Sequence, residues 1–271
     1  MNNLVSTEWL EKNLDNVRLL DATWHMPATN RDAYSEFLKQ HIKNANFFDL
    51  DKTSNQNSTL PHMLPSKNYW EKTISDFGIK NSDHIVIYDS SDVISSCRVW
   101  YNFLYFNHNS DFVSVLDGGL KKWIIENRET TQKISPTFKS NYSAKENKLM
   151  VLDKNQVNLN ILNKNFQLID ARNKERFNGL QPEPRKELNS GHIKNSKNLP
   201  FTALINDLDN TFKSKKEIKK IFKNIDIEFN KDVAFTCGSG VTACILGLAN
   251  SIISGKSPTI YDGSWSEYGL K

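Results

Sequence analysis

Cys237 is the residue of this 271-residue sequence with the clearest potential for chemistry. It opens the run Cys-Gly-Ser-Gly-Val-Thr-Ala (237–243), which follows a short apolar stretch at 233–235 and precedes an apolar run of helical length at 243–253. The pattern predicts a buried strand, a glycine-bearing turn and a helix, so that backbone N–H groups and the positive helix end converge near the sulfur. Such donors favour the nucleophilic thiolate. A buried structural cysteine is the alternative, which the glycines and the strand–turn–helix context make the weaker one.

A cysteine in such a loop is compatible with two chemistries. A cysteine phosphatase needs an arginine six residues after the nucleophile to bind the phosphate dianion. Position 243 is alanine, so the phosphatase interpretation loses its principal cation. What remains is a thiolate among neutral donors. This arrangement suits the transfer of a sulfur atom as a persulfide, whose anionic terminal sulfur the same N–H groups can hold.

The run 237–243 resembles the active-site loop of the 3-mercaptopyruvate sulfurtransferases, in the two-domain rhodanese superfamily. Thiosulfate sulfurtransferases of that superfamily typically place basic side chains directly after the cysteine, where this chain has Gly238 and Ser239. Further stretches are similar to the family's signatures and occur in the family's order: Leu-Ile-Asp-Ala-Arg (168–172), Arg-Phe-Asn-Gly (176–179), Pro-Glu-Pro-Arg (182–185), Ser-Gly-His-Ile (190–193), Asn-Leu-Pro-Phe (198–201) and Tyr-Asp-Gly-Ser-Trp-Ser-Glu (261–267). The resemblance implies an α/β fold of two tandem rhodanese-like domains, each a parallel sheet flanked by helices, with the active site at the domain interface.

An internal repeat indicates a duplicated domain. Leu-Leu-Asp-Ala at 19–22 matches Leu-Ile-Asp-Ala at 168–171, an offset of 149, and His-Ile-Lys-Asn at 41–44 recurs with an offset of 151. An Asp-Gly pair at 117 recurs at 262. Matches in one order at nearly constant separation favour duplication over a short-period solenoid, and apolar runs that alternate with helical patterns predict parallel sheets. We place the first domain at 1–127, a polar linker at 128–148 and the second domain at 149–271.

The aligned halves predict which domain is catalytic. An offset of 148 places Asp89 opposite Cys237. A carboxylate cannot become a persulfide, so we predict that the first domain is catalytically silent. Cys97 lies in a predicted helix after Asp89, and Cys244 lies in the apolar helix just after the loop. Both are expected to be small core residues, because free cysteine is often buried.

The resemblance also implies which residues act in the reaction. It marks Cys237 as the nucleophile and Ser239 as its partner in the loop. The first-domain stretch Leu-Pro-His-Met-Leu-Pro (60–65) corresponds to a segment through which His62, together with Asp51, reaches Ser239. An imidazole oriented by a carboxylate can polarise a hydroxyl and relay a proton. From composition alone, His62 is an ordinary loop histidine between two prolines.

Substrate binding requires cations for the carboxylate of a small α-keto acid. The resemblance assigns this part to Arg176 and Arg185, whose planar guanidinium groups suit a carboxylate; the alternative is a pair of solvated loop arginines. The loop backbone is implied to bind the donor through Gly238, Gly240, Val241 and Thr242. Arg172 is expected to be a structural ion-pair partner at a strand end. His41 and His192 stand at equivalent repeat positions and are expected to serve the scaffold.

The resemblance therefore implies a sulfurtransferase that moves the sulfur of 3-mercaptopyruvate through a Cys237 persulfide and releases pyruvate. The expected acceptor is a thiol, such as thioredoxin or a low-molecular-weight thiol, or cyanide, and neither a metal nor an organic cofactor is expected. Two alternatives stay open: a thiosulfate sulfurtransferase and a non-catalytic persulfide carrier or binding module. The missing basic residues after Cys237 argue against the first. The set of Arg176, Arg185 and His62 argues against the second, because a carrier needs no carboxylate clamp.

Composition restricts the partners and the compartment. The net charge of +4 arises from 35 basic and 31 acidic residues without a basic block, so no nucleic-acid partner is expected. No apolar run approaches the roughly 18–20 residues of a membrane span, so no membrane association is expected. Three cysteines form neither a metal-binding spacing nor a disulfide framework, which fits a reducing compartment, and we expect a cytoplasmic protein.

Overall fold

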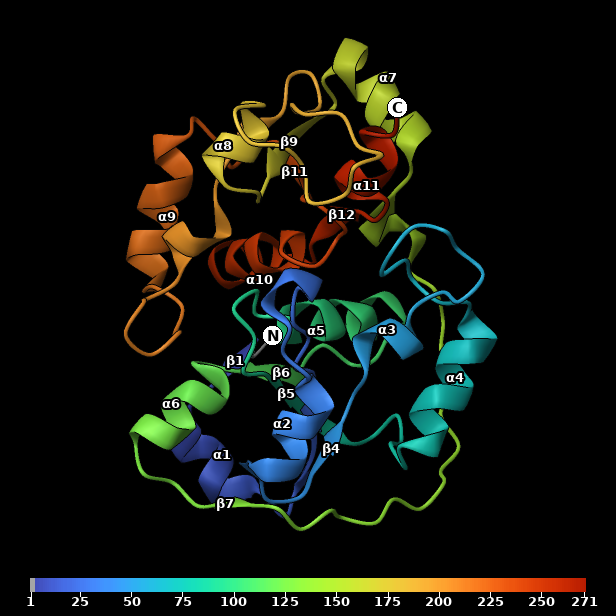
Figure 1. Cartoon of the computed structure of the whole chain (residues 1–271), viewed down its shortest axis with the longest axis vertical. Coiled ribbons are helices and arrows are strands. Elements are labelled where there is room, and N and C mark those ends of the chain that lie inside the picture. The colour runs from blue at the N-terminus through green and yellow to red at the C-terminus, as the bar shows by residue number, and fades with distance from the viewer. Residues whose placement is uncertain (1–2) are drawn as a thin grey trace. The chain divides into compact units, whose positions relative to one another are not determined.

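The computed structural model describes residues 3–271, which form two compact units (Figure 1). Unit 1 comprises the chain up to Gln56 together with Leu64–Asn147 and Asn206–Phe212. Unit 2 comprises Asn57–Met63, Lys148–Ile205 and Lys213–Lys271. Each unit has its own five-stranded sheet and its own helices, so each is an α/β domain.

The sheet of unit 1 is parallel throughout and has the order β1-β6-β5-β2-β4. These strands are β1 (Leu4–Val5), β2 (Val17–Asp21), β4 (Ala45–Phe47), β5 (His84–Tyr88) and β6 (Val113–Leu116), and a separate antiparallel pair joins β3 (His41–Ile42) to β7 (Thr130–Thr131). The helices are α1 (Thr7–Asn13), 3-10 helix η1 (Pro27–Thr29), α2 (Ala33–Lys39), α3 (Leu50–Thr53), α4 (Lys67–Asp76), α5 (Ser96–Tyr105) and α6 (Gly119–Ile125).

Helices cover both faces of this sheet. On one face Leu10 of α1, Phe37 of α2 and Trp123 of α6 pack with the sheet residues Leu19 and Val86. On the other face lie α4 and α5, whose contact is made of stacked and edge-on aromatic rings, Trp70 with Phe103 and with Phe106. Burial on both faces explains why the central strands are almost continuously apolar.

Unit 2 repeats this architecture with the order β10-β9-β11-β12-β8. Its parallel strands are β8 (Val151–Leu152), β9 (Phe166–Asp170), β10 (Lys197–Asn198), β11 (Asp232–Thr236) and β12 (Thr259–Tyr261). Its helices are η2 (Lys148–Met150), α7 (Lys154–Asn163), α8 (Lys174–Phe177), η3 (Phe201–Leu204), α9 (Lys215–Asn224), α10 (Ala243–Ser254) and α11 (Ser264–Tyr268).

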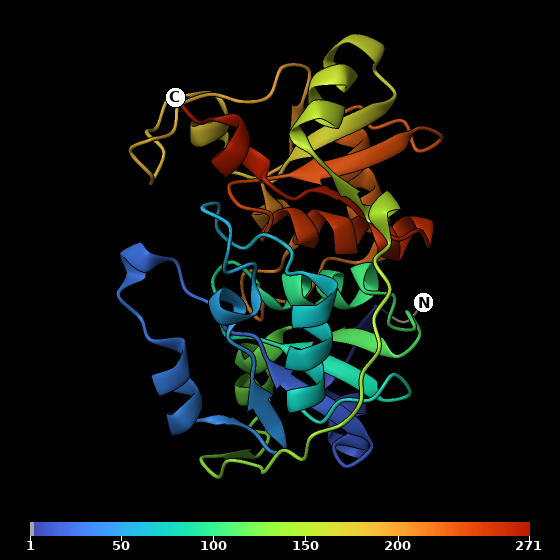
Figure 2. The same cartoon turned by 90° about the vertical axis from the view of Figure 1, so that its right-hand side faces the viewer.

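The two faces of the second sheet are covered by different helices, with α7 and α10 on opposite sides (Figure 2). Val157 of α7 and Trp265 of α11 pack with Leu168 and Ala234 on one face. On the other face Phe222 of α9 meets Phe235 of β11 edge-on, and α10 packs against β11 and β12. Read in reverse, the strand order of unit 2 matches that of unit 1 strand for strand. The prediction of two tandem α/β domains with parallel sheets is confirmed.

Each unit also contains one segment from the opposite half of the sequence. Residues 57–63 belong to unit 2, and residues 206–212 belong to unit 1. The two segments are separated by 149 positions, the same offset that relates β2 to β9, so they are equivalent parts of the repeat. In unit 1 the Phe212 N–H donates to Asp117 Oδ1 (2.8 Å), and Lys121 Nζ donates to the Asp207 carbonyl (2.6 Å). The exchange is therefore reciprocal, and its segment in unit 2 carries His62.

The carboxyl groups of the buried Asp21 and the half-buried Asp117, both in unit 1, are poorly compensated. Burial raises the pKa of Asp21, at the end of β2, to about 6, although Thr23 donates to it from both its N–H and its hydroxyl. Burial likewise raises the pKa of Asp117 to about 6, against the hydrogen bond from Phe212. Asp21 is 2% exposed, so its ionised form is held without contact with water.

Replacing Asp21 by Asn should stabilise unit 1 in a pH-dependent way. An acid with a raised folded pKa destabilises the fold above that pKa and loses this penalty as pH falls from about 6 towards 4, because the folded state then binds the extra proton. A shift of about two units corresponds to about 3 kcal/mol. Urea unfolding should therefore show that the variant-minus-parent difference in unfolding free energy is larger at pH 7.5 than at pH 4.5 by about 2 kcal/mol, because about a third of the penalty remains at pH 4.5. An equal difference at both pH values would contradict the assignment.

Candidate functional site

Cys237 directly follows β11 in the centre of the second sheet, and α10 begins six residues later. The predicted strand and helix around the cysteine are confirmed, because residues 233–235 lie inside β11 and residues 243–253 lie inside α10. Cys237 is 2% exposed. The connecting residues 237–242, called here the Cys237 loop, lie at the carboxyl end of the parallel strands, where open α/β sheets place their sites.

The loop backbone is held by the segment that follows β12. The Cys237 N–H donates to Ser264 Oγ (3.2 Å), and the Cys237 carbonyl accepts from the Trp265 N–H (3.0 Å). The Gly238 carbonyl accepts from the Ser266 N–H (2.8 Å). These contacts explain the Asp-Gly-Ser-Trp-Ser-Glu stretch at 262–267, because three of its residues fix the loop. The N–H of Cys237 itself is therefore used by the scaffold, which the sequence does not reveal.

Four further N–H groups of the Cys237 loop can serve a ligand. Across residues 3–271, these backbone donors have no acceptor within the protein: Gly238, Ser239, Val241 and Thr242. Gly240 has φ +77°, a left-handed conformation that favours glycine. The loop thus offers several neutral donors beside Cys237, as expected for a nest that holds an anion.

His62 lies against this loop within unit 2. Its Nδ1 is 2.9 Å from Ser239 Oγ, and the residue is 5% exposed. His62 adopts a left-handed φ of 59°, a strained backbone conformation for a residue with a Cβ. Asp51 belongs to unit 1, where its carboxylate accepts from Trp24 Nε1 (2.9 Å). The structure therefore brings Ser239 and His62 together, while the part assigned to Asp51 stays a prediction.

An alternating chain of charges leads from β9 to the loop. Arg172 bonds both oxygens of Asp170, with Nη2 2.7 Å from Oδ2, and its Nη1 donates to Glu183 Oε1 (2.9 Å). Arg172 also stacks on the Trp265 ring at 4.5 Å. Arg176 then donates to Glu183 from Nη2 (2.6 Å) and Nε (3.2 Å). Arg172 is confirmed as a structural ion-pair partner.

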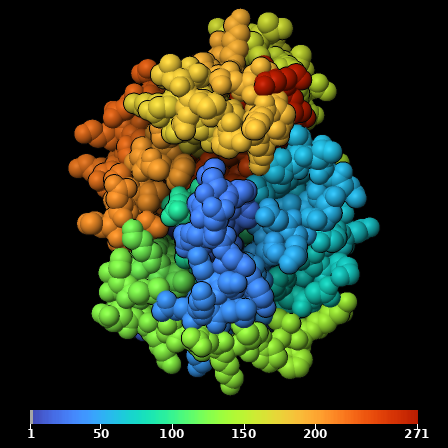
Figure 3. All heavy atoms as spheres, in the orientation of Figure 1, coloured from blue at the N-terminus to red at the C-terminus, as the bar shows by residue number. Residues whose placement is uncertain are grey.

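Arg176 and Arg185 differ in their surroundings. A Cβ at Gly238 would lie 3.2 Å from Arg176 Nη2, so the absence of a side chain at 238 leaves room for this guanidinium against the loop. Arg185 is half-buried in the surface segment 178–191 (yellow in Figure 3), and its guanidinium has no hydrogen-bond or ion-pair partner among residues 3–271. Glu183 was not predicted as a site residue. The feature of the sequence that could have indicated it is an acidic residue between two prolines and close to three arginines.

Residues expected to serve the core or scaffold do so. Cys97 and Cys244 are fully buried in α5 and α10. His41 stacks on Phe37, and its Nδ1 contacts the Phe37 carbonyl (2.7 Å). His192 repeats both contacts with Phe177, at 2.8 Å from the carbonyl.

Residues 3–271 contain neither a metal-binding cluster nor a membrane-spanning helix. No group of three or more His, Cys, Asp or Glu side chains is placed to hold a metal ion in this part of the chain. No helix within the same range is long and apolar enough to cross a membrane.

Comparison with known proteins shows the family. Residues 6–126 and residues 153–271 each match the rhodanese-like domain. The chain belongs to the rhodanese family. It is 38% identical to 3-mercaptopyruvate sulfurtransferase of Mus musculus, with 99% of this chain and 92% of the mouse protein covered. It is 36% identical to thiosulfate sulfurtransferase of Rattus norvegicus, with 98% and 91% covered. The crystal structure of SseA from Escherichia coli, a 3-mercaptopyruvate sulfotransferase, is similar with a TM-score of 0.88 and 30% identity over 98% of this chain and 100% of that one.

These relatives confirm the predicted resemblance and fold. The protein consists of two rhodanese-like domains, each a parallel sheet flanked by helices, and it is a sulfur-transferring enzyme. The relatives include enzymes named for either of two sulfur donors, 3-mercaptopyruvate and thiosulfate, so membership of the family is compatible with both.

The first rhodanese-like domain carries different chemistry at the equivalent positions. Asp89 occupies the place of Cys237, and its carboxylate accepts from the N–H groups of Ser91 (2.8 Å) and Ser96 (2.9 Å). This carboxylate thus fills its own loop with an anion, and burial raises its pKa above the ordinary value. Glu36 precedes the stacked phenylalanine where Arg176 does in the second domain.

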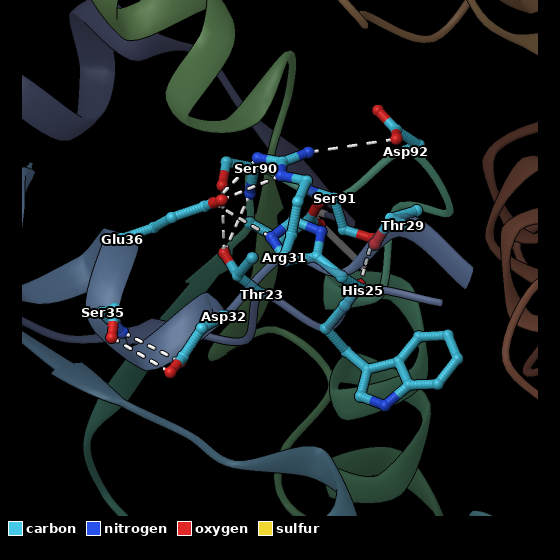
Figure 4. Close-up of polar contacts among 12 residues, drawn as sticks. Thr23, His25, Thr29, Arg31, Asp32, Ser35, Glu36, Ser90, Ser91 and Asp92 are labelled. Carbon is cyan, nitrogen blue, oxygen red and sulfur yellow. Dashed lines mark hydrogen bonds and ion pairs between the residues drawn. The ribbon is translucent and has the colours of Figure 1, made fainter. Parts of the chain in front are cut away.

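A cluster of polar residues surrounds Glu36 in this first rhodanese-like domain (Figure 4). Arg31 bonds both oxygens of Glu36 (2.8 and 2.7 Å) and lies 3.9 Å from Asp92, and His25 Nε2 is 3.0 Å from Glu36. These hydrogen bonds, chiefly from Arg31, lower the pKa of Glu36. The equivalent position is therefore negative in the first domain and positive in the second.

Arg172 should be the most costly residue of the charge chain to remove. Its side chain is 1% exposed, as are those of Asp170 and Glu183, so Arg172→Met leaves two carboxylates buried without their shared cation. Removing one partner of a buried pair costs about 3–5 kcal/mol. Arg176→Met is the matched control, because that side chain is 19% exposed and Glu183 keeps Arg172. Urea unfolding should show a clearly larger loss for Arg172→Met, and equal losses would contradict the structural role of Arg172.

Proposed function

We propose that this sulfurtransferase uses 3-mercaptopyruvate as its donor and carries the sulfur as a persulfide on Cys237. The observation that carries the proposal is the 2.9 Å contact of His62 Nδ1 with the hydroxyl of Ser239, which lies in the loop of the buried Cys237. A thiosulfate donor leaves sulfite and needs no proton at carbon. Mercaptopyruvate leaves a carbanion that must be protonated, so a hydroxyl coupled to an imidazole in the same loop favours it.

The proposed reaction balances with the groups present. The Cys237 thiolate attacks the donor sulfur, a sulfur–sulfur bond forms, and the carbon–sulfur bond breaks with its electron pair on the carbon. The product is the enolate of pyruvate, which takes a proton from Ser239, and His62 supplies the proton to Ser239 in turn. Asp51 is proposed to orient His62. The persulfide stays in the loop, where the N–H groups of Gly238, Gly240, Val241 and Thr242 are proposed to bind donor and persulfide.

Arg176 and Arg185 are proposed to bind the carboxylate and carbonyl of the donor. Among residues 3–271 the Arg185 guanidinium has no partner that would compete with a substrate, and Arg176 lies against the loop at Gly238. The cations are therefore in the second rhodanese-like domain, with the cysteine. The first domain, with Asp89 and Glu36 at the equivalent positions, is proposed to be catalytically silent.

The proposed acceptor is a thiol, such as thioredoxin or a low-molecular-weight thiol, with cyanide as an assay substitute. A cytoplasmic location is proposed from the three buried, reduced cysteines.

Thiosulfate is the second candidate donor, because the rat thiosulfate sulfurtransferase is nearly as similar as the mouse 3-mercaptopyruvate enzyme. The Cys237 loop carries no basic side chain, so a dianion would find less charge compensation there. Comparing kcat/KM for the two donors separates these candidates. Pyruvate release by the purified protein with a small thiol separates both from a persulfide carrier that depends on a partner protein.

Cys237→Ser should abolish turnover and persulfide formation. After treatment with mercaptopyruvate and without acceptor, intact-mass measurement of the parent protein should show one added sulfur atom. Cys244→Ala, which changes a fully buried thiol at the second position of α10, is the control and should gain the same mass. Added sulfur on the Cys237→Ser protein would place the nucleophile elsewhere.

His62→Ala should slow pyruvate release more than it slows persulfide formation from other donors. Loss of one positioned proton-transfer group costs on the order of 10²–10⁴-fold in rate. The effect should appear in kcat with mercaptopyruvate, whereas thiosulfate should still load Cys237, because that reaction leaves no carbanion. Unchanged kcat with mercaptopyruvate would remove His62 from the mechanism.

A further inference from the structure

Glu183 binds Arg176, the arginine that lies against the Cys237 loop. Its side chain is 1% exposed and receives two arginines at once, Arg172 on Oε1 and Arg176 on Oε2 and Oε1. Arg172 in turn donates to both carboxylate oxygens of Asp170. The chain Asp170–Arg172–Glu183–Arg176 therefore holds two acids and two bases, and their formal charges sum to zero.

Two consequences follow for the end of this chain that meets the loop. Arg176 is held from two of its nitrogens, so its guanidinium has a fixed position 3.2 Å from where a Cβ at Gly238 would be. Its positive charge is also cancelled by a carboxylate at contact distance. Arg176 can therefore direct hydrogen bonds to a substrate while it adds little net positive potential.

We propose that Glu183 is a positioning residue that also sets the donor's preferred charge. It fixes Arg176 and neutralises it, so that Arg185 supplies the net positive charge for the substrate. A site with one uncompensated cation and neutral loop donors matches a monoanion better than a dianion. This inference rests on the proposed function, because it explains how the same loop prefers mercaptopyruvate to thiosulfate.

The first rhodanese-like domain supports a role specific to the reaction rather than to the fold. Its Asp21 has Thr23 where Asp170 has Arg172, and Glu36 stands where Arg176 does. The same sheet is built there without the charge chain. Among residues 3–271, this series of four charged side chains is thus present only in the domain that carries Cys237.

Equilibrium binding tests the charge effect without turnover. In a Cys237→Ala background, calorimetry gives dissociation constants for pyruvate, a monoanion, and for sulfate, an unreactive dianion. Coulomb energy scales with ligand charge. Glu183→Gln should therefore lower the dissociation constant of sulfate by a factor that is the square of the factor for pyruvate. In a water-like dielectric, one charge about 8 Å away, beyond the Arg176 guanidinium, gives on the order of 2-fold for a monoanion and 5-fold for a dianion. The matched control is Glu187→Gln, an exposed acid in the same segment, which should leave the ratio unchanged.

Glu183→Asp separates position from charge and retains an acid for Arg172 if Glu183→Gln does not fold. It keeps the negative charge but shortens the reach to Arg176. The ratio of sulfate to pyruvate binding should stay at the parent value, while kcat for pyruvate release falls on the order of 10-fold. A ratio that shifts in Glu183→Asp, or that fails to shift in a folded Glu183→Gln, would overturn the charge role; full kcat in Glu183→Asp would overturn the positioning role.

The proposed function has a separate readout. If the unmodified enzyme releases no pyruvate from mercaptopyruvate, the proposed donor is wrong, while the binding ratios still judge Glu183. If it releases pyruvate and Glu183→Gln leaves the ratio at the control value, the inference fails alone.

Discussion

The buried pairing of Arg172 with Asp170 and Glu183 is the constraint on which the second domain depends. Three charged side chains, each 1% exposed, are tolerated only because every charge meets an opposite one at hydrogen-bond distance. Arg172 also stacks on the Trp265 ring, and the backbone N–H of Trp265 donates to the Cys237 carbonyl. The same arginine therefore connects three parts of the domain: the end of β9, the segment after β12 and the surface segment 178–191. Moving the end of β9 or the segment that carries Glu183 would leave a charge unpaired in the interior.

The Cys237 loop shows what such fixed surroundings provide. Its Cys237 N–H and the carbonyls of Cys237 and Gly238 bond the segment after β12, whereas the N–H groups of Gly238, Ser239, Val241 and Thr242 have no acceptor among residues 3–271. A loop that needs no rearrangement to present several donors stabilises a developing anion at little reorganisation cost. In the first domain the N–H groups of Ser91, in the corresponding loop, and of Ser96, at the start of α5, donate to the Asp89 carboxylate. One scaffold thus either offers its donors to a sulfur anion or satisfies them internally.

The sequence allowed the strand, turn and helix around Cys237 to be predicted, because apolar runs and glycines act over a few neighbouring residues. The domain duplication was also predictable, since offsets near 149 recur along the chain. The bond from Cys237 to Ser264 spans 27 positions with no periodicity to reveal it. His62 is a further case: its composition is that of any loop histidine, and only the resemblance linked it to Ser239, 177 positions away. Glu183 was missed because its role exists only once two arginines from different elements converge on it.

Duplication explains why the exchanged segments diverged. Residues 57–63 and 206–212 are equivalent in the repeat, and each packs in the unit built mainly from the other half. In unit 2 the segment presents an imidazole to Ser239; in unit 1 it presents a backbone N–H to Asp117. A backbone N–H can only hold its partner, whereas an imidazole can also give up or take a proton near neutral pH. The fold needs the segment in both units for packing, but only the unit with a cysteine gains from a titratable group there. The symmetric architecture therefore supplies the position, and a single side chain in one copy supplies the chemistry.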